Sequence, residues 1–234
     1  LRYCNNRKPE ENEGAEKLFY YNQILVSTYN NKARLGTISS RYEHYLEWKD
    51  VYPKNIEDYK NKSSQEILIE GIFNHKNFLD IIRNFIIFEV VEGKTIKQIT
   101  RYQQYRAVHK TIDRLKNVHN PRERGGIVWH TQGSGKSLSM LWFTQKVLRT
   151  LPGSWTFVMV TDRIDLDEQL YETFADSDVI TGGVNVHADS SRHLRELLGA
   201  DHRYVFTTIH KFLTPEEGGE TGEARLRQPT GNLT

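Results

Sequence analysis

The sequence predicts an α/β protein whose carboxyl-terminal half contains a parallel β-sheet. Short apolar runs alternate with amphipathic helical patterns from about residue 125 onward, the order that places parallel strands between crossover helices. The apolar runs are hydrophobic throughout, as in sheets that helices cover on both faces. A length of 234 residues with 37% hydrophobic residues is enough for one large domain, or for one and a half typical domains.

The amino-terminal half has a different pattern, in which a hairpin precedes helices. Two β-rich runs, 23–29 and 33–38, are joined across Asn30-Asn31-Lys32, residues that tolerate turn geometry. Ser63 and Glu66 have the spacing of a capping box ahead of an apolar helix, and a second short helix is expected over 76–84.

The middle of the chain contains the predicted domain boundary. A β-rich run over 85–91 is closed by Gly93, and a long helix is predicted from about residue 95 to 118. We place the boundary near residue 90, which divides the chain into 1–90 and 91–234.

The carboxyl-terminal half supplies the elements of the parallel sheet. The predicted strands cover 127–129, 156–160 and 204–207, and the predicted helices cover 136–150, 165–174 and 190–198. The tail from Pro215 onward is turn-forming and charged and is predicted to be a loop.

Bulk composition limits the class of protein without identifying it. The formal charge of +2 is too small to indicate nucleic-acid binding, which must be argued locally. Cys4 is the single cysteine, which excludes an internal disulfide and a cysteine-based zinc cluster. No apolar run approaches the roughly 20 residues of a membrane span, so we expect a cytoplasmic protein with no membrane partner. The chain begins with Leu1 rather than Met, and we expect a fragment of something longer.

A glycine-rich segment between the strand 127–129 and the helix 136–150 is the strongest chemical signal. It reads His130-Thr131-Gln132-Gly133-Ser134-Gly135-Lys136-Ser137. Its glycines let the backbone N–H groups face phosphate oxygens, and the following helix adds its positive end. Lys136 would reach the β- and γ-phosphates, and the Ser137 hydroxyl would complete a Mg²⁺ shell.

One residue of this segment departs from the general motif, which has glycine where His130 stands. The alternative interpretation is an ordinary glycine-rich turn between strand and helix. The core pattern arises by chance in a chain of this length about one time in a hundred, given average residue usage. We therefore predict a nucleoside triphosphate site over residues 130–137, with Lys136 and Ser137 as its chemically active side chains.

Segments on both sides of the loop narrow the class of protein, because a phosphate loop alone also fits kinases, GTPases and transporters. Together they resemble the restriction, or motor, subunit of Type I restriction-modification enzymes. They stand in that family's order and are not shared by generic helicases. The segments that carry the resemblance are 12–23, 33–38, 42–49, 129–140, 161–170 and 207–212.

The resemblance implies a fold and an activity. It implies an α/β chain in which the C-terminal part of a PD-(D/E)xK nuclease domain is followed by a partial RecA-like, parallel-sheet P-loop motor domain. Members of the family translocate double-stranded DNA by ATP hydrolysis and cut it far from the recognition site. The implied cofactors are ATP and Mg²⁺, and the implied partners are DNA and the methyltransferase and specificity subunits. His130 in the glycine position is itself a feature of this family.

The resemblance also implies roles for residues outside the loop. It places Thr161-Asp162-Arg163 and Thr207-Thr208 against the DNA strand, and Gln104 at the position of an adenine-recognising glutamine. Each has a plainer alternative. The first segment could be a charged helix-entry turn capped by Asp165, the threonines could be ordinary strand residues, and Gln104 could be exposed surface.

The nuclease centre is not found in this sequence. Glu47-Trp48-Lys49 imitates the catalytic Glu-x-Lys, but no Asp precedes Asp50 to complete a metal site. In the resembled family the catalytic Asp and Glu-x-Lys lie upstream of what matches Leu1, and Tyr3 could be the tyrosine of the Q-x-x-x-Y element that follows them. The DEAH-type acidic motif is also absent before Thr234, so we expect this chain alone to bind nucleotide weakly without turnover.

Three other functions stay open at this point. The first is another superfamily 2 DNA- or RNA-dependent ATPase without nuclease activity. The second is a phosphotransferase, although no Arg-rich lid is evident in the sequence. The third treats the glycine-rich turn as structural within a nucleic-acid-binding module.

Overall fold

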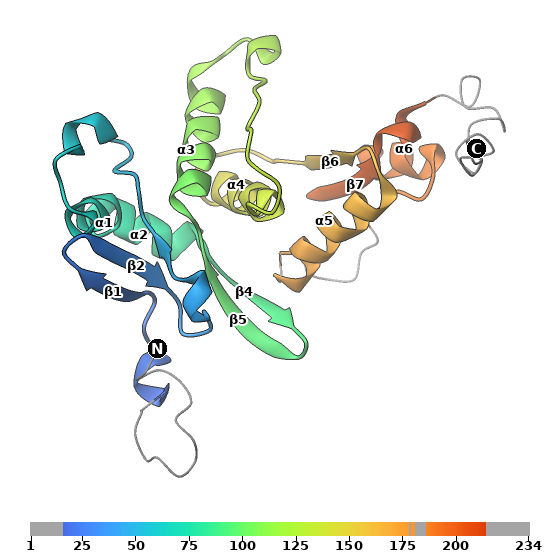
Figure 1. Cartoon of the computed structure of the whole chain (residues 1–234). Coiled ribbons are helices and arrows are strands. Elements are labelled where there is room, and N and C mark those ends of the chain that lie inside the picture. Colours follow the sequence, from blue (N-terminus) through green and yellow to red (C-terminus); the bar gives the residue numbers. More distant parts are fainter. Residues whose placement is uncertain (1–15, 178, 181–185, 214–234) are drawn as a thin grey trace, which may run out of the picture. The chain divides into compact units, whose positions relative to one another are not determined.

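The structure is a computed structural model that describes residues 16–177, 179–180 and 186–213 (Figure 1). The chain divides into two compact units, Leu1–Pro152 with Asp176–Val179 and Gly153–Ala175 with Ile180–Thr234. Among the described residues there are five short 3₁₀ helices beside the larger elements: η1 (Glu16–Phe19), η2 (Tyr42–His44), η3 (Ile56–Tyr59), η4 (Pro121–Glu123) and η5 (Ile209–Phe212). Tyr3 and the predicted loop from Pro215 lie outside the described residues.

The first unit begins with a small antiparallel sheet in the order β1 (Leu25–Tyr29), β2 (Lys32–Gly36) and β3 (Leu46–Glu47). The predicted hairpin is confirmed, and its turn places Asn30 at a positive φ of 34°, a conformation that asparagine tolerates well. The β2 side chains Ala33 and Leu35 are buried, so this strand carries the inner face of the sheet.

Two helices, α1 (Ser64–Ile72) and α2 (His75–Asn84), follow the sheet, and α1 packs against β2. The capping box is confirmed, because the Ser63 hydroxyl accepts from the Glu66 N–H and the Glu66 carboxylate accepts from the Ser63 N–H. The hydrogen bond that the Glu66 carboxylate accepts from the Ser63 backbone N–H, together with the one that it accepts from Lys62, lowers the pKa of Glu66 to about 2. The first turn of α1 is therefore fixed by local sequence.

A second hairpin, β4 (Ile86–Val91) with β5 (Lys94–Ile99), corrects the prediction for the middle of the chain. The helix predicted from residue 95 begins only at Tyr102, since residues 94–99 pair antiparallel with β4 instead. Glu92 and Gly93 both have positive φ, at 50° and 74°, which is the geometry of a tight hairpin turn. The predicted boundary near residue 90 falls inside this hairpin, and the division into nuclease and motor parts stays a prediction.

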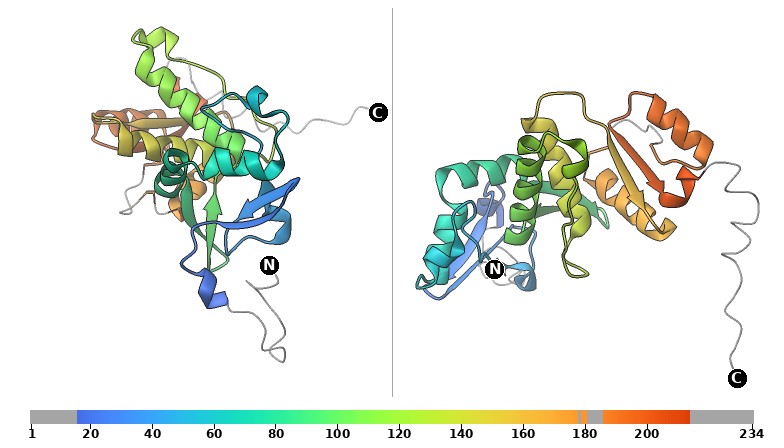
Figure 2. Two further views of the ribbon diagram at one scale, coloured as in Figure 1. Left: turned by 90° about the vertical axis from the view of Figure 1, so that its left-hand side faces the viewer. Right: turned by 90° about the horizontal axis from the view of Figure 1, so that it is seen from above.

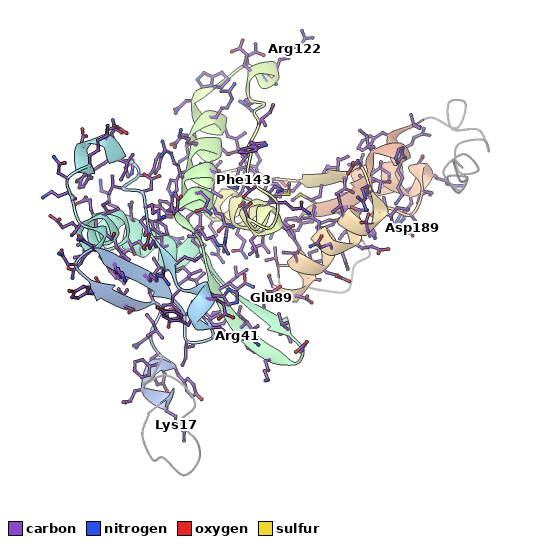
Figure 3. The ribbon with its side chains drawn as sticks, viewed as in Figure 1. Lys17, Arg41, Glu89, Arg122, Phe143 and Asp189 are labelled. Carbon is purple, nitrogen blue, oxygen red and sulfur yellow. The ribbon has the colours of Figure 1, made fainter. Side chains whose placement is uncertain are left out.

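Helices α3 (Tyr102–Asn117) and α4 (Lys136–Thr150) pack against each other and form the centre of the first unit. Helix α4 begins and ends at the predicted residues. Figure 3 shows the described side chains on this framework, with Phe143 on α4. The buried apolar side chains around the contact come from both helices and from the preceding segment: Phe85, Tyr105, Val108, Ile112, Leu141, Trp142 and Val147.

The strand predicted over Ile127–Trp129 is wrong for this structure. These residues belong to no helix or strand of the structure, and Ile127 and Trp129 are 94% and 81% exposed. In the described part of the first unit, the strands pair as β1-β2-β3 and β4-β5. Apolar composition does not make a strand without a neighbour, because cross-strand packing provides most of the stabilisation.

The second unit contains the parallel pair β6 (Phe157–Thr161) and β7 (Tyr204–Thr208), with α5 (Ile164–Asp176) and α6 (Ser191–Gly199) beside it (Figure 2). The predicted parallel strands are confirmed for these two segments. All five residues of β7 are buried, which agrees with the expected run of hydrophobic residues. The Phe206 ring lies 5.4 Å from the Phe174 ring of α5, and Val205 packs with Leu194 of α6.

Candidate nucleotide-binding site

The predicted phosphate loop forms a tight turn that leads into α4. Gly133 and Gly135 have φ angles of +72° and +77°, in the left-handed region that favours glycine. Gly135 is the N-cap of α4, and the first bond of the helix runs from the Ser139 N–H to the Gly135 carbonyl, at 3.1 Å. The N–H groups of the first helical turn are therefore free of intrahelical partners. With 15 residues behind them, they form a positive helix end suited to an anion.

The exposure of the loop also fits a ligand site. Thr131, Gln132 and Gly133 are exposed, while Ser134 is only 7% exposed. Within the described part of the chain, Ser134 Oγ and His130 Nδ1 are buried polar atoms without a hydrogen-bond partner. Buried polar groups are normally satisfied, so two such atoms at one turn are consistent with a site built for a polar ligand.

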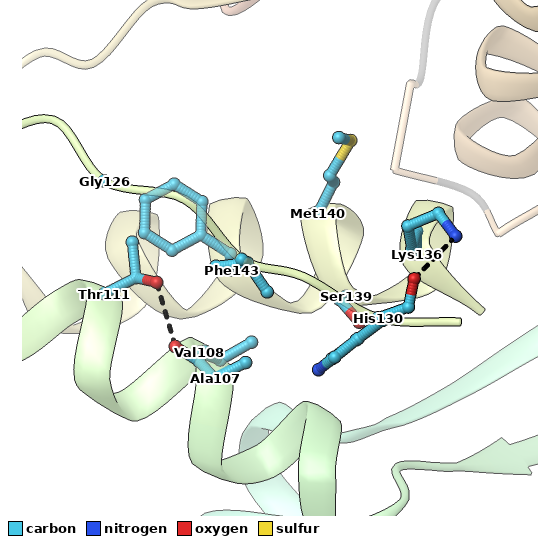
Figure 4. A pocket seen from close by; sticks show the side chains of 10 residues that line it. Ala107, Val108, Thr111, Gly126, His130, Lys136, Ser139, Met140 and Phe143 are labelled. Atoms are coloured by element: carbon cyan, nitrogen blue, oxygen red, sulfur yellow. Dashed lines mark hydrogen bonds between the residues drawn. The ribbon is translucent and has the colours of Figure 1, made fainter. Parts of the chain in front are cut away.

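Lys136 lies across the loop. Its Nζ donates to the carbonyl oxygens of His130, at 3.2 Å, and Thr131, at 3.0 Å; the first of these bonds is drawn in Figure 4. The side chain is exposed, and both partners are neutral carbonyls. A phosphate would offer this ammonium a charged acceptor, which makes a stronger hydrogen bond than a neutral one.

Gln104 lies at the inner side of the loop rather than on the surface, with an exposed fraction of 2%. Its Nε2 donates to the carbonyl oxygens of Ser134 and Gly135, at 3.0 Å each. Its Oε1 accepts from the Arg101 N–H at 2.8 Å. The alternative that placed Gln104 on exposed surface is therefore wrong, and its contact with adenine stays a prediction.

Two of the hollows beside the loop are lined by residues of its 133–136 stretch, and both lie within the first unit. The first, of about 290 Å³, is bounded by α3, α4 and the extended segment before the loop (Figure 4). It is mostly apolar, with Val108, Met140 and Phe143 on its walls and Lys136 among its polar residues. The second, of about 450 Å³, is lined by the loop glycines together with Arg41 and Arg101. Both hollows provide room beside the predicted phosphate loop.

A buried ionic cluster connects α4 to the helices behind it. Lys146 of α4 donates to the carboxylate of Asp80 on α2, and its Nζ lies 3.0 Å from His109 Nε2 on α3. His109 Nε2 also lies 2.8 Å from Asp80 Oδ2. Burial raises the pKa of Asp80, but the bonds from His109 and Lys146 together outweigh it and hold that pKa well below its usual range. Burial lowers the pKa of Lys146, against the opposing effect of Asp80.

Sequence reasoning missed this cluster. Its three members are separated by tens of residues, and no local spacing marks them. Lys146 resembles any solvated helix lysine, yet its side chain is 8% exposed. The one feature of the sequence that could have drawn attention to Lys146 is its position in the helix that follows the phosphate loop.

In the second unit, the structure brings together the two segments expected to lie against DNA. Thr161 and Thr208 are register partners, so both segments lie at the carboxyl ends of the parallel strands. Asp162 is exposed, and the exposed Arg163 pairs with Asp165 at 2.6 Å. Because α5 begins at Ile164, Asp165 lies inside its first turn rather than ahead of it.

Thr207 and Thr208 are much less accessible, at 0% and 3% exposure. The Thr207 hydroxyl donates to the Thr208 carbonyl at 3.3 Å. Their side chains are thus those of buried strand residues in this structure, and a role in DNA contact stays a prediction.

The part of the chain that contains the loop matches a known protein family. Residues 103–230 match the family described as SWI2/SNF2 ATPase, and that match takes in Gln104, the whole loop and α4. The chain belongs to the SWI2/SNF2 ATPase family. The SWI2/SNF2 match also includes Thr161–Arg163 and Thr207–Thr208, so every described candidate residue falls within it.

Curated relatives extend the similarity to the amino-terminal half. The chain is 37% identical over 232 residues to the Type I restriction enzyme HindI endonuclease subunit of Haemophilus influenzae, covering 93% of this chain and 21% of the relative. It is 32% identical over 218 residues to the putative Type I restriction enzyme MjaIXP endonuclease subunit of Methanocaldococcus jannaschii, covering 84% and 20%. A Staphylococcus aureus Type I restriction enzyme endonuclease subunit is 32% identical over 204 residues, covering 86% and 20%. The predicted resemblance is confirmed, and the chain spans about a fifth of the length of these relatives.

Two negative findings concern the described part of the structure. Among the residues it describes, no helix is long and apolar enough to cross a membrane. Over the same ranges, no group of three or more His, Cys, Asp or Glu side chains could hold a metal ion. The Mg²⁺ contact expected of the Ser137 hydroxyl, which requires a bound nucleotide, stays a prediction.

Proposed function

We propose that this chain carries one half of the ATP site of a Type I restriction enzyme motor, and that ATP binding there drives movement of double-stranded DNA coupled to its cleavage. The observation that carries the proposal is the loop of residues 130–137, whose left-handed glycines turn the backbone into the amino end of α4. The similarity to restriction endonuclease subunits supports the choice of motor among the many proteins that use such a loop.

Each loop residue then has a defined task. Backbone N–H groups from Gly133 to Ser137 hold phosphate oxygens, and the dipole of α4 adds positive charge. Lys136 exchanges its two carbonyl partners for the β- and γ-phosphates, and the Ser137 hydroxyl contributes to the Mg²⁺ shell. Magnesium supplies neutralisation of the charge that develops on the phosphates. ATP and Mg²⁺ are the proposed cofactors.

The proposed DNA contact lies at the carboxyl ends of the parallel strands β6 and β7 in the second unit. Arg163 and Thr161 lie at the carboxyl ends of parallel strands, where α/β sheets place their binding sites. The guanidinium of Arg163 could exchange its exposed Asp165 partner for a DNA phosphate, since exposed ion pairs are weak. The proposed partners are double-stranded DNA and the methyltransferase and specificity subunits, in the cytoplasm.

The second candidate is another superfamily 2 ATPase that lacks a nuclease. The names of the relatives favour the first proposal, because all three are endonuclease subunits of Type I restriction enzymes. The two proposals differ in whether cleavage accompanies ATP-dependent movement along DNA.

The test uses the endonuclease subunit that contains this chain, assembled with methyltransferase and specificity subunits. Displacement of a triplex-forming strand would report translocation, and linearisation of a circular DNA would report cleavage. We expect Lys136→Ala to abolish both, because the triphosphate loses its charged ligand. Lys110→Ala, an exposed lysine of α3, is the matched control and should retain both. Full translocation by the Lys136→Ala enzyme would contradict the proposal, whereas translocation without cleavage by the unmodified enzyme would favour the second candidate.

A further inference from the structure

We propose that the basic face of α3, together with the segment that returns beside it, forms a second surface for the phosphate backbone of double-stranded DNA. This inference rests on the proposed function and adds a DNA contact in the first unit, separate in sequence from the contact proposed at Thr161–Arg163. The surface surrounds a hollow of about 610 Å³, and the basic side chains that line this hollow are Arg106, Lys110, Arg114 and Arg124.

The hollow lies between α3 and the segment that leads from α3 to the phosphate loop. Figure 1 shows this segment turning back after α3 and running alongside that helix. Arg114 of α3 donates from Nη2 and Nε to the Glu123 carbonyl, at 2.6 and 3.1 Å. Arg124 of the returning segment donates from Nε to the Val118 carbonyl at 2.7 Å. These bonds join the two walls and hold both guanidinium groups in place.

Both guanidinium groups keep most of their donors for a ligand. An arginine side chain has five N–H groups. The bonds to the backbone use two of these in Arg114 and one in Arg124, and both residues are exposed. The planar fork of a guanidinium matches two oxygens of a phosphate, and a side chain that is already held loses little freedom on binding. The two arginines are therefore preorganised for phosphate.

The hollow has little negative charge that could repel an anion. Among the described residues that line it, Asp50 is the one acidic residue, and its side chain is only 4% exposed. Asp50 Oδ2 accepts from Arg106 Nη1 at 3.1 Å, and Oδ1 accepts from the Val51 N–H at 2.9 Å. The Arg106 side chain stays 45% exposed, so its remaining N–H groups are accessible to a ligand.

The spacing of the cations along α3 fits a chain of phosphates better than a single anion. Arg106 and Arg114 are eight residues apart on this helix, which is about 12 Å along its axis. One strand of DNA carries a charge about every 3.4 Å, so this distance corresponds to about three or four phosphates. Contacts to the backbone carry no sequence information directly, so binding at this surface should not depend on the DNA sequence.

Lys110 lines the same hollow but should contribute little to the affinity. Among the described residues, nothing fixes its ammonium group. A free lysine must give up side-chain freedom when it pairs, which offsets most of the attraction of one exposed charge. Lys110→Ala is therefore a control within the hollow itself.

The test measures the binding of two short DNA duplexes of unrelated sequence to the chain, by fluorescence anisotropy at several salt concentrations. Arg114→Ala with Arg124→Ala removes both held guanidinium groups, whereas Arg114→Lys with Arg124→Lys keeps the charge and loses the fork. The matched control, Lys76→Ala with Lys94→Ala, removes the same charge from two exposed lysines of the first unit that do not line the hollow. Circular dichroism checks that each variant is folded.

We expect the double alanine variant to bind both duplexes about tenfold more weakly, and to lower the slope of log affinity against log salt by about two. The double lysine variant should also bind more weakly, but with an unchanged slope, because it keeps its charge. Lys110→Ala and the matched control should each change the affinity by less than about threefold. If the alanine variant fails to fold, the double lysine variant and Arg106→Lys provide the same comparison.

Three results would overturn the inference. The first is equal loss of affinity in the double alanine variant and in the matched control, which would indicate net charge alone. The second is a strong preference for one of the two duplex sequences. The third is binding of a poly-glutamate peptide more tightly than DNA, with the same dependence on Arg114 and Arg124, which would assign the surface to an acidic protein segment.

The failure of this inference is distinguishable from the failure of the proposed function. If Arg163→Ala weakens duplex binding and the arginine variants of the hollow leave it unchanged, the hollow is not a DNA surface while the contact in the second unit stands. If the unmodified chain binds neither duplex, DNA is wrong as a partner of this chain and the second surface falls with it.

Discussion

Gly135 combines two constraints in one residue, because its backbone is left-handed and its α-carbon faces the Gln104 amide. Its φ is +77°, and an added Cβ would come within 2.6 Å of Gln104 Nε2. Gly133, two residues earlier, has a similar φ of +72° but open space around the position of a Cβ. A substitution at Gly133 therefore tests backbone strain alone, whereas the same substitution at Gly135 also tests the contact between the loop and α3.

We predict that Gly135→Ala weakens ATP binding more than Gly133→Ala does. Both substitutions impose a left-handed alanine, at a cost of about 1–2 kcal/mol. Only Gly135→Ala also displaces the Gln104 amide, which should bring the total loss of affinity to about a hundredfold. Titration of ATP into the two variants measures the difference. Gly125→Ala, which has open space and no positive φ, is the control. Equal losses at the two loop glycines would show that the Gln104 contact is without effect on binding.

Among the elements, α2, α3 and α4 are joined by the cluster of Asp80, His109 and Lys146. The cluster fixes the helix that follows the phosphate loop against two helices formed earlier in the chain. A buried lysine that loses its carboxylate partner is strongly destabilising, because its charge is left without compensation.

We predict that Asp80→Asn lowers the free energy of unfolding at neutral pH by about 3–5 kcal/mol. The folded pKa of Asp80 lies below the ordinary value of 3.8, so its contribution is present above that pH and is lost as pH falls further. The free energy of unfolding of Asp80→Asn should therefore fall less than that of the unmodified chain as the pH is lowered below 3.8. Urea unfolding at several pH values measures both effects, with the exposed Asp58→Asn as control. Equal stability of Asp80→Asn and the unmodified chain would mean that the cluster does not hold these helices together.

Elements with local signals were predictable from the sequence. The bounds of α4 follow from the glycine turn before Lys136, and the start of α1 follows from the Ser63–Glu66 capping box. The same local reasoning failed at residues 94–99, where Ile96 and Ile99 fit both a helix face and a strand. The turn at Glu92 and Gly93, together with pairing to β4, decided in favour of the strand.

Tertiary contacts were not predictable by the same means. The burial of Gln104 and its bonds to the loop depend on how α3 packs beside α4, which no spacing in the sequence encodes. Ile127–Trp129 has the composition of a strand, but a strand also requires a neighbour that local sequence does not specify. The loop residues themselves were predicted correctly as a turn, because glycine chemistry is local.

At the scale of the whole molecule, the chain contains the phosphate loop but no Asp-Glu-x-His string. Its length is about a fifth of that of its curated relatives. We therefore expect nucleotide binding without turnover from this chain alone, since activation of the attacking water requires further acidic and arginine groups. ATP hydrolysis that Lys136→Ala abolishes would contradict that expectation.

The most direct test of the central claim is the affinity of the chain for ATP with Mg²⁺, measured beside Lys136→Ala and the exposed control Lys110→Ala. The loop geometry predicts saturable binding by the unmodified chain and by the control, and a loss of at least about tenfold in Lys136→Ala. Equal affinities for ATP in all three proteins, or no binding by any of them, would contradict a nucleotide site at residues 130–137.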